Sequence, residues 1–207
     1  MGCKDNYTPV PQSSPENQPQ FILSNDLYVS EEIDGGLTKT TFTTNDTKYL
    51  SYEGMTMWTV WGEDVINFSS RTVKMAKSEG YSGGGYGIVF CHDEYEVEGN
   101  NKHAMLIVMI NNDGQYIIGK AVGGVFTDFG WWKSTPHLKK GLGISNELKV
   151  IYEEDKYCLI INGEEVERFR DDEEPCLRNG KNGYIVVITP FDNFPASRVN
   201  VYFFEER

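Results

Sequence analysis

The chain carries one group of side chains whose spacing fits hydrolytic chemistry. Glu94, Glu96 and Glu98 occupy alternate positions, so in a β-strand all three carboxylates would project from one face. Two carboxyl groups about 5–5.5 Å apart can act as nucleophile and acid/base in the cleavage of a glycosidic bond. Residues 99–102, Gly-Asn-Asn-Lys, are typical of a turn and follow directly. We therefore interpret the three glutamates as a solvated hairpin tip and expect no catalytic residue.

A second group of side chains fits the recognition of sugars, which stack their apolar faces on aromatic rings. Trp58 and Trp61 lie in one strand-like stretch, Trp131 and Trp132 are adjacent in another, and Tyr86 begins a third. We take these five residues as ligand-binding candidates. Neighbouring residues of a strand point to opposite faces, so one of the adjacent tryptophans should be core and the other outward or in a groove. The alternative for each ring is an ordinary core position.

The remaining reactive side chains suggest no further site. The three histidines are scattered along the sequence, and no serine or cysteine occupies a nucleophile elbow. Cys91, Cys158 and Cys176 match no zinc motif, so we expect neither a metal ion nor a cofactor. Cys91 and Cys158 lie in strand patterns, where a free cysteine acts as a small buried hydrophobe. A disulfide between Cys158 and Cys176 is the alternative.

The elements that must position these side chains are β-hairpins. Short apolar stretches are separated by the turn dipeptides Asp113-Gly114, Gly123-Gly124 and Asn162-Gly163. All three dipeptides accept the positive φ angles of a two-residue hairpin loop, and such a loop fixes the register of its strands. We therefore expect Ile110 to pair with Ile117 and Leu159 to pair with Val166.

Two of the stretches are apolar at nearly every position, namely residues 105–110 and 184–188. Strands of this kind are covered on both faces. One face should meet the core, and either a ligand groove or the chain's own segment Phe21–Val29 should lie against the other. Further strand candidates are residues 36–44, 55–62, 65–77 (which also suits a helix), 86–92, 125–131, 148–152 and 198–204. About eleven or twelve strands predict an all-β fold, a two-sheet antiparallel sandwich.

Length and charge agree with one domain that does not bind nucleic acid. The chain has 207 residues, which is ordinary for a single sandwich, and we place that domain at residues 21–207. The formal net charge is −12, and the acidic side chains cluster beside turns at residues 153–155, 164–165 and 171–174. We interpret these clusters as solvated loops. A nucleic-acid partner would need clustered Lys and Arg instead.

Residues 1–20 differ in composition from the rest of the chain. They contain four of the eight prolines and almost no apolar side chain, so we expect a disordered tether. Cys3, followed by a polar Pro/Ser/Gln linker, looks like the lipidated first residue of a mature bacterial lipoprotein, with Met1-Gly2 as an expression remnant. This predicts a lipid-anchored protein of the bacterial cell envelope that meets a membrane only through its anchor. An incidental cysteine in a disordered tail is the alternative.

The order of the strand and turn motifs resembles a known family. The motifs are Gly85-x-Gly-Ile-Val-Phe90, Asp113-Gly-Gln-Tyr116, Trp131-Trp132, Asn146-Glu-Leu-Lys-Val150 and the turn at residues 161–166. Over roughly residues 35 to 205 they resemble the concanavalin A-like jelly-roll domains, in particular the laminin-G-like and 3-keto-disaccharide hydrolase-like group of bacterial secreted proteins and lipoproteins.

The resemblance implies a concave groove on one sheet as the ligand site. It implies a calcium site near Asp93 or Asp113, although no dense acidic loop supports one. Retaining glycosidases of this fold carry Glu-x-Asp-x-Glu, whereas residues 94–98 have Glu in the middle. The fold serves lectins, glycosidases and adhesion modules alike. We expect a non-catalytic binding module for a glycan. The alternatives are a module that binds a surface protein and a glycosidase-like enzyme.

Overall fold

The computed structural model describes residues 21–23, 29–34, 36–43, 56–97, 100–173, 175–192 and 197–206. At residues 21–23, 56–64, 96–97, 100–101 and 190 it describes the backbone alone. Among these residues no helix has the length and apolar character needed to cross a membrane.

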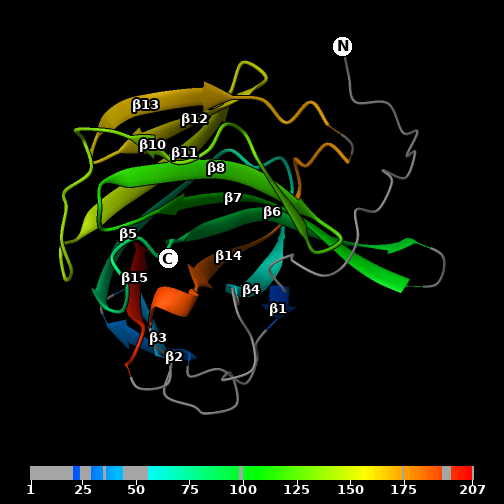
Figure 1. The fold of residues 1–207 in the computed structure, drawn as a ribbon. Helices are drawn as coiled ribbons and strands as arrows, with labels where there is room; N and C mark the ends of the chain where they lie inside the picture. Colours follow the sequence, from blue (N-terminus) through cyan, green and yellow to red (C-terminus); the bar gives the residue numbers. More distant parts are fainter. Residues whose placement is uncertain are drawn as a thin grey trace.

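The first sheet consists of strands that run side by side across the view in Figure 1. In spatial order they are β1 (Phe21–Leu23), β4 (Thr56–Val65), β14 (Gly180–Val187), β6 (Tyr86–Val97), β7 (Asn100–Ile110), β8 (Gln115–Val122) and β10 (Lys133–Ser134), and β9 (Val125–Asp128) also pairs with β8. Every pairing is antiparallel except that of β1 with β4, which is parallel.

The second sheet is antiparallel throughout. Its order is β13 (Glu164–Phe169), β12 (Lys156–Ile161), β11 (Asn146–Glu153), β5 (Ser70–Glu79), β15 (Asn200–Glu206), β3 (Leu37–Thr43) and β2 (Val29–Asp34). A 3-10 helix, η3 (Pro190–Asp192), follows β14. The predicted all-β sandwich of two sheets is confirmed. The stretch 65–77, which also suited a helix, contributes most of β5.

The main core lies between the two sheets. Alternate residues of β7, such as Leu106 and Val108, belong to the same buried cluster as Leu148 and Val150 of β11. The rings of Tyr184 and Phe203, one from each sheet, stack with centroids 4.2 Å apart. This interior is the ordinary core that the alternation along the strands predicts.

A buried arginine ties the two sheets together. Arg71 of β5 donates from Nη1 to the carbonyl oxygens of Val89 (2.9 Å) and Gly183 (2.6 Å) in the first sheet. Its Nε and Nη2 donate to the carboxylate of Glu205, each at 2.8 Å. The guanidinium group therefore satisfies its buried donors while it bridges the layers.

Two of the three predicted hairpin loops have two residues. Val122 pairs with Val125 around Gly123-Gly124, and Ile161 pairs with Glu164 around Asn162-Gly163. The Asp113-Gly114 loop is one residue longer, because the backbone N–H of Asn111 donates to the carbonyl of Gln115. Ile110 consequently pairs with Tyr116, and the predicted pairing with Ile117 is wrong by one residue.

Two other expectations and one alternative also fail. A register shift between Leu159 and Ile160 makes Leu159 pair with Glu167 instead of Val166. Asp171, expected in a solvated acidic loop, is buried and accepts a 2.8 Å bond from the ammonium group of Lys120. Cys158 is a free buried thiol, so the alternative disulfide between Cys158 and Cys176 is not formed.

Candidate functional site

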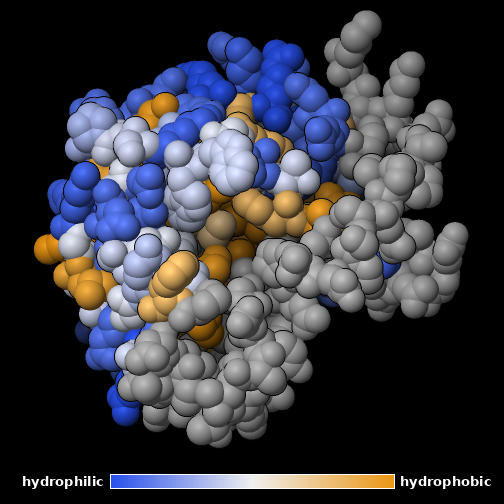
Figure 2. Space-filling view, in the orientation of Figure 1, coloured by the Kyte–Doolittle hydropathy of each residue, from blue (hydrophilic) through white to orange (hydrophobic). Residues whose placement is uncertain are grey.

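The outer face of the first sheet, which is the face turned away from the main core, carries a second apolar cluster. Its buried members are Val89, Met105, Ile107, Met109, Ile117, Ala121 and Ile185. The prediction that residues 105–110 and 184–188 are covered on both faces is therefore confirmed. Figure 2 shows apolar residues gathered in a recess on this side of the molecule, over the region of β7, β6 and β14 in Figure 1.

Strand register shows what forms the floor of this face. One row of paired residues runs Ile185, Gly87, Met109 and Ile117, and the next runs Gly183, Val89, Ile107 and Gly119. Directly paired residues project to the same face. None of these eight floor positions carries an ionisable side chain. These eight positions therefore offer no pair of carboxylates for glycoside hydrolysis, and the next residue of the second row is Asp128 of β9, which pairs with Gly119.

Two aromatic side chains cover part of the floor. A Cβ on Gly119 would lie 2.4 Å from Cζ of Phe126, so the absence of a side chain there makes room for the phenyl ring. A Cβ on Gly85 would lie 3.1 Å from Cη2 of Trp132 and 3.2 Å from the sulfur of Met109. Both rings pack against the second cluster. Trp132 is thus part of the outer face.

Trp131 is presented to solvent by a short, well-anchored loop after β9. Phe129 packs against the main core and Trp132 packs against the second cluster. Between these anchors Trp131 has φ of 57° and 77% of its surface exposed. Oδ1 of Asp128 accepts hydrogen bonds from the backbone N–H groups of Gly130 (3.0 Å) and Trp131 (2.7 Å). We call residues 128–132 the Trp131 loop.

The two hydrogen bonds change the pKa of the Asp128 carboxyl group. Hydrogen bonds from the N–H groups of Trp131 and Gly130 favour the ionised form and lower the pKa of Asp128. At neutral pH the carboxylate is therefore charged and able to hold the loop.

Of the adjacent tryptophans, Trp131 is outward as expected, but Trp132 is half-buried on the outer face and does not lie in the main core. The sequence predicted a strand over residues 125–131, whereas β9 ends at Asp128 and Trp131 lies in a bend with positive φ. Loop geometry, instead of strand alternation, separates the two rings. No pattern in the sequence marked Asp128 as the residue that holds this loop.

Of the other three aromatic candidates, only Tyr86 has a described side chain. Tyr86 is fully buried in the main core, where its hydroxyl donates to Oδ1 of Asn112 (2.7 Å), so its predicted ligand role is wrong. Trp58 and Trp61 belong to β4, and their Cα partners are Ile185 and Asn182. Their side chains lie outside the described residues, as does Cys3.

Two other expectations concern what lies against the outer face and where the glutamates stand. Residues 21–23 form an edge strand beside β4, and Val29 begins β2 of the other sheet, so the segment 21–29 is divided between the sheets at its two ends.

The strand expected to end at His92 continues to Val97. Glu94 is exposed and pairs with His103 near the end of the β6–β7 hairpin, and the side chains of Glu96 and Glu98 lie outside the described residues.

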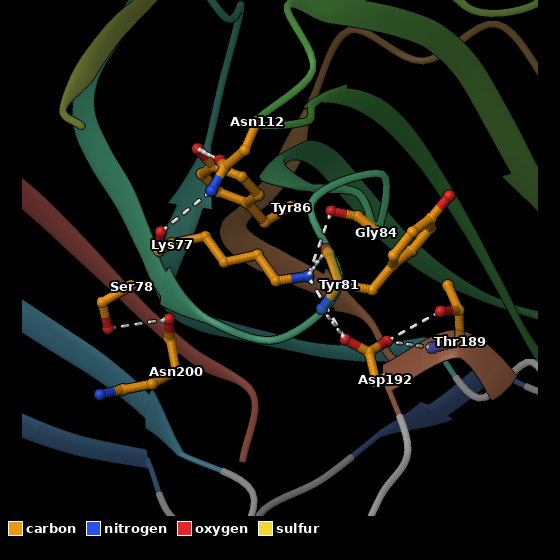
Figure 3. A network of polar contacts seen from close by, with 9 residues as sticks. All are labelled: Lys77, Ser78, Tyr81, Gly84, Tyr86, Asn112, Thr189, Asp192 and Asn200. Carbon is orange, nitrogen blue, oxygen red and sulfur yellow. Dashed lines mark hydrogen bonds and ion pairs between the residues drawn. The ribbon is translucent and has the colours of Figure 1, made fainter. Parts of the chain in front are cut away.

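A buried polar network organises the loops where β5 leads into β6 and β14 leads into η3 (Figure 3). Nζ of Lys77 donates to the carbonyl oxygen of Tyr81 (2.8 Å) and lies 3.7 Å from Oδ1 of Asp192. The Asp192 carboxylate also accepts from the backbone N–H groups of Tyr81 and Thr189, both at 2.6 Å. Burial lowers the pKa of Lys77, and the nearby Asp192 carboxylate opposes that shift.

This network stabilises two loops and so positions an aromatic pair at the surface. It holds the two loops that carry the rings of Tyr81 and Phe191, whose centroids are 5.2 Å apart. Lys77 is enclosed, and its ammonium group is committed to loop carbonyls and the Asp192 carboxylate. The network therefore supports an exposed aromatic pair and supplies no reactive group.

The chain matches no protein-family model and no curated protein. Among solved structures it is similar to the carbohydrate-binding module CBM66 from Bacillus subtilis, with 11% identity, a TM-score of 0.51 and coverage of 89% of this chain and 99% of that one. It is also similar to a prokaryotic β-1,3-1,4-glucanase (lichenase) from a mouse hindgut metagenome, with 11% identity, a TM-score of 0.55 and coverage of 95% and 90%. A Bacillus licheniformis β-glucanase gives 7% identity, a TM-score of 0.52 and coverage of 98% and 95%.

At these identities the likeness shows the fold. The two antiparallel sheets and their similarity to these proteins define a concanavalin A-like jelly-roll sandwich. The predicted family resemblance is confirmed at the level of the fold.

Proposed function

We propose that the protein binds a glycan without cleaving it, with Trp131 as the ring on which a sugar stacks. The observation that carries the proposal is a largely exposed indole on a loop whose backbone is anchored by Asp128, Phe129 and Trp132. An aromatic ring on a preorganised loop costs less conformational entropy to immobilise than one on a mobile loop. The similarity to a carbohydrate-binding module supports the same class of ligand.

The eight floor positions carry no ionisable side chain, and the carboxylates of Asp128 and Glu94 on the same side of the sheet lie at its margins, which favours binding over hydrolysis. The glucanases of similar fold make a glycosidase the second candidate. In that case the exposed carboxylate of Glu94 would have to act, and Glu94→Gln would abolish turnover while leaving binding intact.

The test is a glycan array probed with the wild-type protein, followed by affinity measurements on the oligosaccharide that binds best. Trp131→Ala should weaken that binding at least about tenfold, because an aromatic anchor at a binding site contributes on the order of 2 kcal/mol. Ile66→Ala is the matched control, since Ile66 is an equally exposed apolar side chain outside the Trp131 loop.

Three results would contradict the proposal. An array without any bound glycan would favour the adhesion module. Equal affinities of the wild-type protein and Trp131→Ala would show that the sugar binds elsewhere. Release of reducing sugar from the bound oligosaccharide would favour the glycosidase.

We further propose attachment to a bacterial envelope through a lipid on Cys3, which lies outside the described residues. The Pro-rich composition of residues 1–20 supports a tether. Expression of the chain behind a bacterial lipoprotein signal, with labelling by a fatty-acid analogue, should give a labelled membrane-bound protein. Cys3→Ser should abolish the label.

A further inference from the structure

Three side chains with metal-binding atoms converge where β6 and β7 extend toward their hairpin. Nε2 of His92 lies 3.1 Å from Nδ1 of His103, and Oε1 of Glu94 lies 4.0 Å from the same nitrogen. All three ligand atoms are within 4.8 Å of one another. His92 is 2% exposed, whereas the side chains of His103 and Glu94 are 32% and 53% exposed. The cluster therefore has a buried base and an open side.

A β-bulge in β6 brings these residues to one face. The pairing with β7 shifts between Phe90 and Asp93, and Cys91 within the shift has φ of 53°. Phe90 and Cys91 both belong to the main core, so the extra residue reverses the alternation that follows. His92 and Glu94 then project on the side of the outer face, as does His103, which pairs with Glu94. Without the bulge His92 would point into the core.

The surrounding structure maintains this bulge at some conformational cost. A cysteine rarely adopts positive φ, and such residues persist only where their neighbours fix them. Gly180 of β14 is one such neighbour, because a Cβ at that position would lie 2.2 Å from the carbonyl oxygen of His92. Bulges of this kind commonly re-aim a side chain beside a functional site. The bulge and the glycine together place the His92 ring in the cluster.

We propose that His92, His103 and Glu94 bind a divalent transition-metal ion of the zinc class. Zn²⁺ bonds to imidazole nitrogens at 2.0–2.1 Å, which places two such nitrogens in a tetrahedral site about 3.3 Å apart. The two histidine nitrogens are already close to that separation. A rotation of the exposed Glu94 side chain that moves its carboxylate oxygen by about 1–2 Å would bring it to the corresponding position.

The donor set selects the class of ion. Two imidazole nitrogens and one carboxylate suit Zn²⁺ and its neighbours, whereas Ca²⁺ and Mg²⁺ prefer oxygen ligands throughout. Three protein ligands leave a fourth position for water or a ligand, as in zinc sites that are not purely structural. This proposal departs from the expectation of no metal ion, and it does not depend on glycan binding at Trp131.

The experiment uses untagged protein freed of metal by dialysis against a chelator. Zn²⁺ affinity is measured by competition with a chromophoric chelator, and Co²⁺ is added in parallel because its visible absorption reports tetrahedral coordination. We expect one equivalent to bind the wild-type protein. His103→Ala should weaken Zn²⁺ binding at least about 100-fold and Glu94→Gln about tenfold. Mutation of residues that merely hydrogen-bond to metal ligands already lowers metal affinity by roughly 10- to 100-fold.

His137→Ala is the matched control and should bind Zn²⁺ like the wild-type protein, because His137 is an exposed histidine on a different loop. Near-ultraviolet circular dichroism of each variant verifies the fold. Failure of the wild-type protein to bind one equivalent would overturn the proposal. So would binding that His103→Ala leaves unchanged, or binding that His137→Ala removes.

Discussion

The floor of the outer face and the segments at its margins are built in opposite ways. The floor combines apolar side chains with the glycines Gly87, Gly119 and Gly183, and its larger members are buried. The margins carry the exposed Trp131 and the His92–His103 pair, both positioned by residues with positive φ. The regular strands thus supply the support, and both proposed sites lie where strand geometry is interrupted.

The largest effect should come from the floor. Gly87→Val would place a Cβ 1.9 Å from the carbonyl oxygen of Val108 and 2.7 Å from Cα of Met109, and neither backbone atom can move without separating β6 from β7. We expect no cooperative thermal unfolding transition by circular dichroism. Gly124→Ala is the control, because it has open space and only a positive φ to tolerate, at about 1 kcal/mol. A folded Gly87→Val protein would show that the floor is not rigid.

The next largest effect is expected in the buried polar network of Lys77 and Asp192. Asp192→Ala removes the carboxylate beside buried Lys77 and leaves two backbone N–H groups without their acceptor. Breaking a buried ion pair in this way costs about 3–5 kcal/mol. Urea titration should show this loss in the free energy of unfolding. Glu147→Ala, which breaks the exposed pair with Lys74, should cost less than about 1 kcal/mol, and equal losses would contradict the assignment.

A smaller and more local effect is expected at Asp128. The pKa of this carboxyl group is lowered in the folded protein, so its contribution to stability is present above the unfolded value of about 3.9 and is lost as the pH falls through the folded pKa. The amide signal of Trp131 in an NMR titration should therefore shift below about pH 4. Asp128→Ala should abolish this titration and weaken glycan binding, and a Trp131 signal that still titrates in the variant would contradict the role of Asp128.

The smallest effect on stability is expected at Trp131 itself. Because the indole is exposed between its anchors, Trp131→Ala should change the free energy of unfolding by no more than about 0.5 kcal/mol. Urea unfolding measured alongside the binding assay separates the two properties. A loss of several kcal/mol would mean that the ring serves the fold and would remove the contrast between floor and margin.

The repetitive parts of the fold could be predicted from the sequence. Alternation and the turn dipeptides indicated the sandwich, and the unbroken apolar runs at 105–110 and 184–188 indicated strands that are covered on both faces. The errors arise where one residue interrupts the repeat. Asn111 lengthens a hairpin loop, and Cys91 adds a residue to β6. The Asn111 side chain stabilises its loop locally, because its Oδ1 accepts from the backbone N–H groups of Asp113 and Gln115. The bulge at Cys91 could not be predicted from the residue type, because Gly180 of a distant strand makes room for it.

The candidate sites were harder to predict for the same reason. The aromatic residues could be named, but their division between core and surface depends on contacts across the sheet. Tyr86 was misplaced because its strand alternates between two equally apolar faces. His92 and His103 appeared unrelated in the sequence, and only the register of β6 against β7 makes them neighbours.

The bridge formed by Arg71 has a mechanical consequence for the recess. Its guanidinium group binds the carbonyls of Val89 and Gly183 on adjacent strands of the first sheet, and it is itself held by Glu205 of β15, in the same sheet as Arg71. Sliding of one layer over the other would break the two charge-assisted bonds to these carbonyls together. The outer face should therefore keep its shape before a ligand reaches the proposed site, so that binding there carries no cost of rearrangement between the layers.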